Sequence, residues 1–339
     1  MSPFSRDPGP EGGGADGATA SPYACALMGT IAVTGSVAYD TIMVFDGRFA
    51  DHILADQTHI LNVSFLVERL ERRRGGTAAN IAYSLALLGE RPLLCASVGA
   101  DFSEDLAALH AIGVDTSHAL LCDDVGTAAA FITTDIDDNQ ITAFFPGAMA
   151  RSAGVDLTTL SGVEHLVVAP DAPDGMDLHL RQATGIGAKL VFAPAQQLSS
   201  LSDETLVAGL DAAWLVVGND YEFEVISRRT GRDVEALAAA GAMVARTRGG
   251  QGSELRVDGV VHAVPVAPSA AVIDPTGAGD AYIAGLLGGL RTGRAPQVAG
   301  RMGALAATYV VERPGPQTHR YTPQEFAARY AAVFGEALA

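Results

Sequence analysis

The sequence predicts an α/β fold in which a doubly wound, mostly parallel β-sheet is flanked by helices and carries a small β-sheet lid. Two observations predict it. From residue 30 onward, short β-branched runs alternate with longer helical patterns, which is typical of parallel strands joined by helical crossovers. Two other segments are rich in strand-forming residues and break this alternation, so they are assigned to a second sheet.

The main sheet is predicted from short apolar runs, each followed by turn residues and a helical pattern. The first covers residues 31–35, and the last helix, rich in Ala, runs from 323 to about 338. The remaining strands are predicted at 93–98, 165–169, 190–193, 213–218 and 242–247.

The lid is predicted from residues 40–45 and 127–145, where Asp137, Asp138 and Asn139 form a candidate hairpin turn. With their flanks, these segments give a lid of about 36–50 and 120–146 inside a single domain of residues 29–339. Residues 1–28 are rich in Gly, Pro, Ala and Ser without periodicity, which predicts a disordered leader. The natural start could also be Met28, just before the first strand.

Composition excludes several classes of function. The chain has 339 residues and a formal charge of -17, so its field would repel nucleic acid. No apolar run reaches the roughly 18 residues needed to span a bilayer, so we expect no membrane segment and a cytoplasmic location. The three cysteines, Cys25, Cys95 and Cys122, lack metal-ligand spacing and are expected to be buried thiols.

One motif near residue 280 combines a Gly-rich turn with an acid. Asp274-Pro275-Thr276-Gly277-Ala278-Gly279-Asp280 is followed by apolar residues at helical spacing. Because Gly277, Ala278 and Gly279 leave backbone N–H groups unshielded at a helix start, they can bind a phosphoryl oxygen. Asp280 is placed to take a proton from an attacking hydroxyl. The motif indicates phosphoryl transfer to an alcohol; the alternative is a tight turn whose acid favours the helix start.

A second Gly-rich helix start contains Gly75, Gly76 and Asn80. The glycines permit close approach of a ligand, and Asn80 lies one helical turn further on, where its amide suits vicinal hydroxyls. The alternative is tight packing of a helix on a sheet. Ser36 and Asp40 follow the first strand, at the edge where open α/β sheets bind ligands. Taken alone, Asp40 is more often a turn residue.

Two further motifs follow predicted strands. Asn219 and Glu222 lie three residues apart at a helix start, where they can organise water around Mg²⁺; the alternative is a helix cap. Thr247, Gly249 and Gly252 follow the next strand and can contact phosphates. Arg248, between them, either adds charge or is a solvated surface residue.

Taken together, these motifs resemble those of the ribokinase, or phosphofructokinase B, family of small-molecule kinases, and they occur in the same order along the chain. The resemblance implies a ribokinase-like fold, ATP and Mg²⁺, and a lid that often pairs two subunits into a homodimer. It implies that Asp280 is the base and that Asp40, Gly76 and Asn80 hold the acceptor. It also implies that Asp274, Thr276 and the Thr247 segment meet the nucleotide.

Several stretches are similar to actinobacterial-type adenosine kinase within that family. Gln196 and Gln197 are the most informative, because an amide offers paired donor and acceptor groups to a nucleobase. The alternative is a pair of surface loop glutamines. The lid departs from those relatives near Ala130, where they place a stacking aromatic; Phe131 or Phe144 could supply one.

The resulting hypothesis is in-line transfer from MgATP to a primary hydroxyl, most readily the 5′-hydroxyl of adenosine or a related nucleoside. A sugar kinase of the same fold is the alternative. A non-catalytic ligand-binding regulator is a third interpretation, against which the retained Asp280 argues, since binding alone needs no base.

Overall fold

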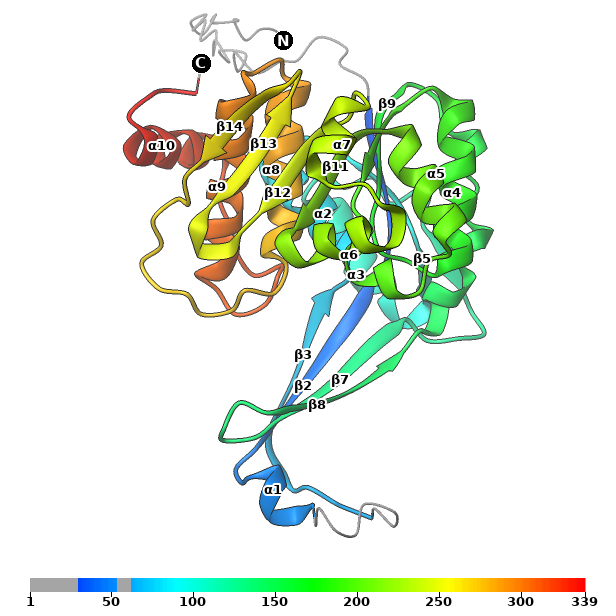
Figure 1. The fold of residues 1–339 in the computed structure, drawn as a ribbon. Helices are drawn as coiled ribbons and strands as arrows, with labels where there is room; N and C mark the ends of the chain where they lie inside the picture. Colours follow the sequence, from blue (N-terminus) through cyan, green and yellow to red (C-terminus); the bar gives the residue numbers. More distant parts are fainter. Residues whose placement is uncertain (1–29, 54–61, 339) are drawn as a thin grey trace, which may run out of the picture.

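An eight-stranded sheet forms the centre of the computed structural model, which describes residues 30–53 and 62–338 (Figure 1). The strand order is β14-β13-β12-β11-β10-β9-β1-β4, and all pairings are parallel except those of β13 and β14. In chain order the strands are β1 (Thr30–Thr34), β4 (Leu93–Cys95), β9 (Val163–Val168), β10 (Lys189–Phe192), β11 (Ala213–Asn219), β12 (Met243–Thr247), β13 (Ser253–Val257) and β14 (Val260–Val264). The predicted α/β class with a mostly parallel sheet is confirmed.

Helices cover both faces of this sheet, because alternate strand residues are buried on opposite sides. On β11, Leu215 and Val217 join one core cluster and Val216 joins the other. The helices are α1 (Phe49–His52), α2 (Thr77–Leu87), α3 (Ser103–Ala111), α4 (Pro173–Ile186), α5 (Asp203–Ala212), α6 (Asp220–Thr230), α7 (Val234–Ala239), α8 (Ala278–Arg291), α9 (Pro296–Val311) and α10 (Pro323–Phe334). Short 3-10 helices are η1 (Ala100–Phe102), η2 (Gly147–Gly154), η3 (Leu157–Thr159), η4 (Ala195–Ser199) and η5 (Gly249–Gln251).

The two core clusters divide the helices between the faces. Residues of α2, α3 and α8 pack in the first cluster, and residues of α4, α5, α6 and α7 pack in the second. Fully burying each Val, Leu or Ile in these layers contributes about 1.5–3 kcal/mol. The layers therefore give the rigid platform on which the loops at the strand ends are held.

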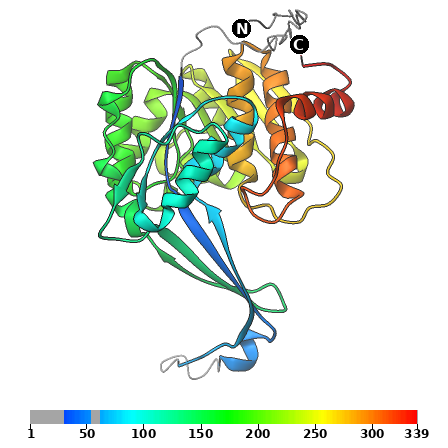
Figure 2. The same cartoon turned by 180° about the vertical axis from the view of Figure 1, so that it is seen from behind.

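The small sheet projects away from this body (Figures 1 and 2). Its order is β3-β2-β7-β8, with β3 (Val67–Gly75), β2 (Ala38–Phe45), β7 (Ala128–Thr134) and β8 (Gln140–Phe145). The predicted hairpin turn joins β7 to β8, and Asp138 within it has φ 61. Such a left-handed conformation is tolerated by Asp better than by most residues.

Four expectations need correction. The predicted strand 93–98 is two strands, since the chain leaves the main sheet after β4 and β5 (Ser97–Gly99) pairs instead with β6 (Leu120–Cys122). The predicted lid range therefore starts too early at 120. The lid also contains β3, which was not predicted because its sequence is rich in charged residues. The last helix ends at Phe334, because Gly335 adopts the left-handed conformation with φ 72.

The predicted leader, Met28 and Cys25 lie outside the described residues. Cys95 and Cys122 are free, buried thiols. Among the helices of the described ranges, none is long and apolar enough to cross a membrane.

Candidate active site

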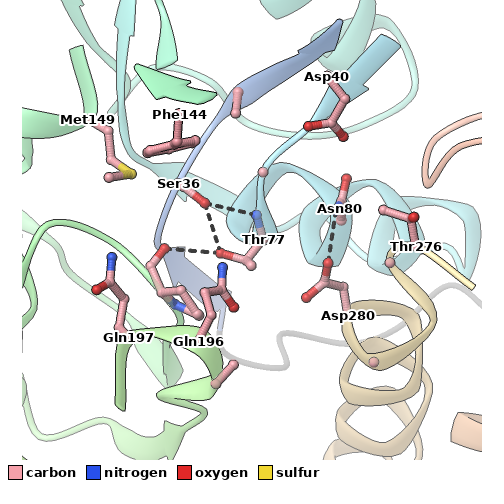
Figure 3. A pocket seen from close by; sticks show the side chains of 16 residues that line it. Ser36, Asp40, Thr77, Asn80, Phe144, Met149, Gln196, Gln197, Thr276 and Asp280 are labelled. Carbon is pink, nitrogen blue, oxygen red and sulfur yellow. Dashed lines mark hydrogen bonds between the residues drawn. The ribbon is translucent and has the colours of Figure 1, made fainter. Parts of the chain in front are cut away.

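A pocket of about 590 Å³ lies where the carboxyl ends of the parallel strands meet the base of the lid. Ser36 follows β1, Pro170 follows β9 and Ala195 follows β10, so three neighbouring strands contribute to one site. The residues that line it are Ser36, Ala38, Asp40, Gly76, Thr77, Asn80, Phe144, Met149, Pro170, Ala195, Gln196, Gln197, Thr276, Gly277, Gly279 and Asp280. Figure 3 shows the pocket with Gln196, Gln197, Phe144 and Met149 toward one end, and Asp40, Asn80 and Asp280 toward the other.

The floor of the pocket forms where the turn that follows β1 meets the start of α2. The Ser36 hydroxyl accepts a hydrogen bond from the Thr77 N–H at 3.1 Å, and the Thr77 hydroxyl donates to the Pro170 carbonyl at 3.1 Å. Gly76 has φ +90, and a Cβ there would lie 2.5 Å from the Ser36 carbonyl oxygen. Only glycine fits this close approach, so Gly76 fixes the start of α2 against the strand.

Gly75 makes room for Asp40 on the neighbouring strand. A Cβ at Gly75 would lie 2.6 Å from Asp40 Oδ2, so a larger residue would displace that carboxylate. Burial, then the negative charge of Asp274, raises the pKa of Asp40, while the Arg73 guanidinium lowers it. Arg73 stands opposite Asp40 in the β2–β3 register. The pocket thus holds the Asp40 carboxylate, and the Arg73 guanidinium on the neighbouring lid strand partly compensates its negative charge.

Asp280 on α8 and Asn80 on α2 meet at the same end of the pocket as Asp40. The Asn80 side-chain amide donates to Asp280 Oδ2 at 2.8 Å (Figure 3). Burial raises the pKa of Asp280 to about 7, with the nearby charge of Glu222 adding to the rise and the Asn80 hydrogen bond opposing it. A carboxylate with a pKa near neutral pH is suited to take a proton from a hydroxyl.

The turn before Asp280 forms a cradle of backbone N–H groups at the start of α8. Gly277 has φ +80, and a Cβ on it would lie 2.4 Å from the Pro316 Cβ, so it requires glycine. A Cβ on Gly279 would meet nothing within 4 Å. The turn is therefore open toward the pocket at Gly279 and closed behind at Gly277, which fits an anionic phosphoryl group at a helix N-terminus.

Asp274, predicted to meet the nucleotide, holds the loop of the cradle in place. Its carboxylate accepts from the N–H groups of Thr276 and Gly315, each at 2.9 Å, and pairs with Arg73 at 3.3 Å. Burial raises the pKa of Asp274, but these partners lower it more and keep it below its usual value. Thr276 does line the pocket. Asp274 thus links the cradle loop to the lid strand.

Asn219 and Glu222 form a capping box on α6, which is the alternative weighed from the sequence. The Asn219 side chain accepts from the Glu222 N–H at 2.9 Å, and Glu222 accepts from the Asn219 N–H at 2.9 Å. This role leaves Glu222 close enough to raise the pKa of Asp280. In the described ranges, no three His, Cys, Asp or Glu side chains cluster to hold a metal ion. A single carboxylate beside a phosphate site still fits Mg²⁺, which usually keeps several waters and phosphate oxygens as ligands.

Thr247, Gly249 and Gly252 lie one strand beyond Asn219 and do not line the pocket. Thr247 stands beside Asn219 in the β11–β12 register. Gly252 is required by the backbone, since its φ is +86 and a Cβ would lie 2.3 Å from the Val264 carbonyl oxygen. Arg248 lies 4.0 Å from Glu254, a long ion pair on the partly exposed strand end.

The other end of the pocket carries amide and apolar side chains. Gln196 is exposed and Gln197 half-buried on η4, and among the described residues neither side-chain amide has a hydrogen-bond partner. Ala195, just before them, has φ 40, a conformation that residues with a side chain rarely adopt. Phe144 lines the pocket and stands opposite Ala130 in the β7–β8 register. Phe144 rather than Phe131 is therefore the aromatic side chain at this wall.

Sequence reasoning missed several residues that hold the site. Arg73 and Gln317 support it from behind, and Thr77, Met149 and Pro170 line it. The only signal for Arg73 was its place two residues before the Gly75-Gly76 pair. Gln317 carried no signal, because its partner Asn80 is 237 residues away.

Comparisons with known proteins agree with this geometry. The family model described as "pfkB family carbohydrate kinase" matches residues 33–323. A nucleoside kinase of Methanothermobacter thermautotrophicus is 31% identical over 279 residues, covering 81% of this chain and 90% of the relative. The structure of Burkholderia thailandensis nucleoside kinase in complex with inosine has a TM-score of 0.82 at 36% identity, covering 91% of this chain and 99% of that chain.

The same Burkholderia enzyme in complex with ADP-inosine has a TM-score of 0.80 at 37% identity, covering 91% of this chain and 97% of that chain. The family match spans most of the chain and includes every pocket residue described above. The chain therefore belongs to the pfkB family of carbohydrate kinases and is a phosphotransferase with an alcohol group as acceptor.

Proposed function

We propose that this protein is an ATP-dependent nucleoside kinase that phosphorylates the 5′-hydroxyl of adenosine or a related purine nucleoside such as inosine. One observation carries the proposal: a single pocket has Asp280 beside an N–H cradle at one end, and at the other end two glutamine amides that have no hydrogen-bond partner among the described residues. A sugar alone would fill only the first end. The relative in complex with inosine supports a nucleoside, which is long enough to reach both ends of the pocket.

In the proposed reaction Asp280 takes the proton of the 5′-hydroxyl. The hydroxyl oxygen attacks the γ-phosphorus of ATP, and the bond from that phosphorus to the ADP oxygen breaks. The N–H groups of Gly277, Ala278 and Gly279 stabilise the charge on the transferred group, for which the Ala278 N–H turns from the Pro275 carbonyl, its partner at 3.1 Å. Asp40, Gly76 and Asn80 hold the ribose, so that the attacking oxygen stays near Asp280. Lid closure excludes water, which would otherwise compete as acceptor.

Glu222, with Asn219 beside it, would hold Mg²⁺ through water next to the cradle. When bound, Mg²⁺ would neutralise negative charge on the phosphates of the nucleotide. Asp274, Thr276 and the segment with Thr247, Gly249 and Gly252 are proposed to meet the rest of the nucleotide, and the overall similarity to the relative in complex with ADP-inosine supports this.

For the base, we propose that Phe144 stacks on the purine and that Gln196 and Gln197 read its edge. Phe144 is 53% exposed, so a base would bury apolar surface on binding. The lid sheet is also proposed to pair two subunits, since β3 and β8 leave its two edges unpaired among the described residues.

The proposal is tested by giving the purified protein MgATP with adenosine, inosine, other nucleosides, ribose and fructose, while ADP and product mass are measured together. We expect nucleoside monophosphates as the main products. The Gln196→Ala and Gln197→Ala variants should raise the KM for the nucleoside about tenfold and change the KM for ribose little. Preferred turnover of a free sugar would contradict the assignment.

The pKa of Asp280 predicts a pH dependence. Because the base works only when ionised, kcat/KM should be level above about pH 7 and fall about tenfold per pH unit below it. A direct product assay from about pH 5 to about pH 8 measures this, with protein stability followed in parallel. A flat profile through this range would contradict Asp280 as the base.

Arg73 is predicted to support acceptor binding without touching the acceptor. In Arg73→Gln, the charge that lowers the pKa of Asp40 is lost, so the acceptor KM should rise on the order of tenfold with a smaller change in kcat. Arg69→Gln is the matched control, because the Arg69 side chain is 67% exposed and pairs with Glu71 only at 3.9 Å. Equal effects in both variants would remove the role of Arg73.

A further inference from the structure

The segment of residues 315–317, between α9 and α10, contacts three parts of the candidate site from behind. The Gly315 N–H donates to Asp274, Pro316 packs on Gly277, and Gln317 bonds to Asn80. All three residues of the segment are buried, and Gln317 is only 3% exposed. None of them lines the pocket, so any effect they have on the reaction passes through the residues they hold.

Of these three residues, Gln317 makes a side-chain hydrogen bond with a defined donor and acceptor. Its Nε2 donates to Asn80 Oδ1 at 2.9 Å, and Asn80 Nδ2 donates to Asp280 Oδ2 at 2.8 Å. An ionised Asp280 can only accept, so Asn80 must present its N–H to it and its oxygen to Gln317. When Asp280 is ionised, both hydrogen bonds therefore run in one direction, with Gln317 donating to Asn80 and Asn80 donating to Asp280.

From this geometry we infer that Gln317 is a positioning residue, which fixes the side-chain amide of Asn80 so that it donates to the ionised base Asp280. The inference rests on the proposed function, because it assigns Asp280 the role of base. With Gln317 in place, an Asn80 turned by a half-rotation would set two N–H groups face to face and its oxygen against the carboxylate. Both contacts are unfavourable while Gln317 keeps its own orientation, in which Nε2 donates to Asn80 and Oε1 has no hydrogen-bond partner among the described residues.

Without the Gln317 donor, Asn80 loses one of the two contacts that select this orientation, and only the ionised Asp280 is left to select it. Asp280 then keeps its hydrogen bond only part of the time, and its ionised form is stabilised less. The acid limb of the pH profile should therefore move to higher pH. A segment that merely packs behind the site would lower stability or turnover without moving that limb.

The test compares Gln317→Met with wild type. Met has a similar length and no donor, so the pH midpoint of the acid limb should rise by about half a unit or more, which lowers kcat at pH 7 about twofold or more. Tyr83→Phe is the matched control, since the Tyr83 hydroxyl donates from the same helix α2 to the His319 carbonyl at 2.7 Å. That variant loses a buried hydrogen bond to the same stretch of chain without touching Asn80.

A shift of the acid limb in Gln317→Met and not in Tyr83→Phe supports the inference. No shift in either variant, or the same shift in both, overturns it. If Gln317→Met proves unstable, Gln317→Leu removes the same donor, and thermal unfolding of each variant separates loss of fold from loss of position.

A second readout does not depend on turnover. The side-chain carboxyl carbons of Asp are labelled with ¹³C, the Asp280 signal is assigned by its absence in Asp280→Asn, and its pKa is measured by titration. A higher pKa in Gln317→Met than in wild type supports the inference, and an unchanged pKa overturns it. If wild type phosphorylates no acceptor, the proposed function fails, and the titration still decides whether Gln317 acts on Asp280.

Discussion

Replacing Asp280 with Asn is expected to lower turnover about 10³-fold while leaving acceptor binding nearly unchanged. Asn matches Asp in shape, and its side-chain oxygen can still accept from Asn80, so the pocket keeps its form. What is lost is the site for the hydroxyl proton. Turnover is measured by direct product detection, and acceptor affinity by calorimetry on the same preparation.

Stability provides the control for this variant. Because burial raises the pKa of Asp280, a neutral amide at that position is not expected to destabilise the fold near neutral pH. The melting temperature of Asp280→Asn should therefore equal or exceed that of wild type. Near-normal turnover in a folded variant would remove Asp280 as the base and leave it as a charge at a helix start.

The second large effect is expected from Gly277→Ala. The added Cβ would lie 2.4 Å from the Pro316 Cβ, and φ +80 is a conformation that Ala adopts only with strain. The cradle must therefore move. We expect a loss of stability of about 1–3 kcal/mol and a fall in turnover on the order of 10²-fold, since the N–H groups no longer face the transferred group.

Gly279→Ala is the matched control for the stability part of this prediction. A Cβ at Gly279 meets nothing within 4 Å, so the fold should keep its melting temperature. The same methyl group stands at the pocket wall, and the KM for ATP should rise. If both variants lose the same stability, close packing of Gly277 on Pro316 is not what shapes the cradle.

Residues that act through local backbone geometry could be predicted from the sequence. Gly76, Gly277 and Asp280 lie within short motifs where a helix follows a Gly-rich turn, and a helix start exposes N–H groups whatever surrounds it. The alternation of strands and helices likewise predicts the sheet, because crossovers dictate parallel pairing. The order of strands brings the turns to one edge.

Residues that act through contacts distant in the chain could not be predicted in this way. Arg73 reaches Asp274 across 201 positions, and Gln317 reaches Asn80 across 237. Neither contact leaves a local pattern, since an arginine in a charged strand and a glutamine in a loop are both ordinary. The β3 strand was missed for the same reason, as its partners and not its apolar content make it a strand.

One measurement tests the central claim most directly. Wild-type protein with MgATP is given inosine or 5′-deoxyinosine in parallel, adenosine is run beside them, and the products are identified by mass and phosphorus NMR. The account predicts nucleoside 5′-monophosphate in equal amount to ADP with inosine and adenosine, and no ADP above background with 5′-deoxyinosine. ADP release that does not depend on the 5′-hydroxyl, or phosphate on another position, would contradict it.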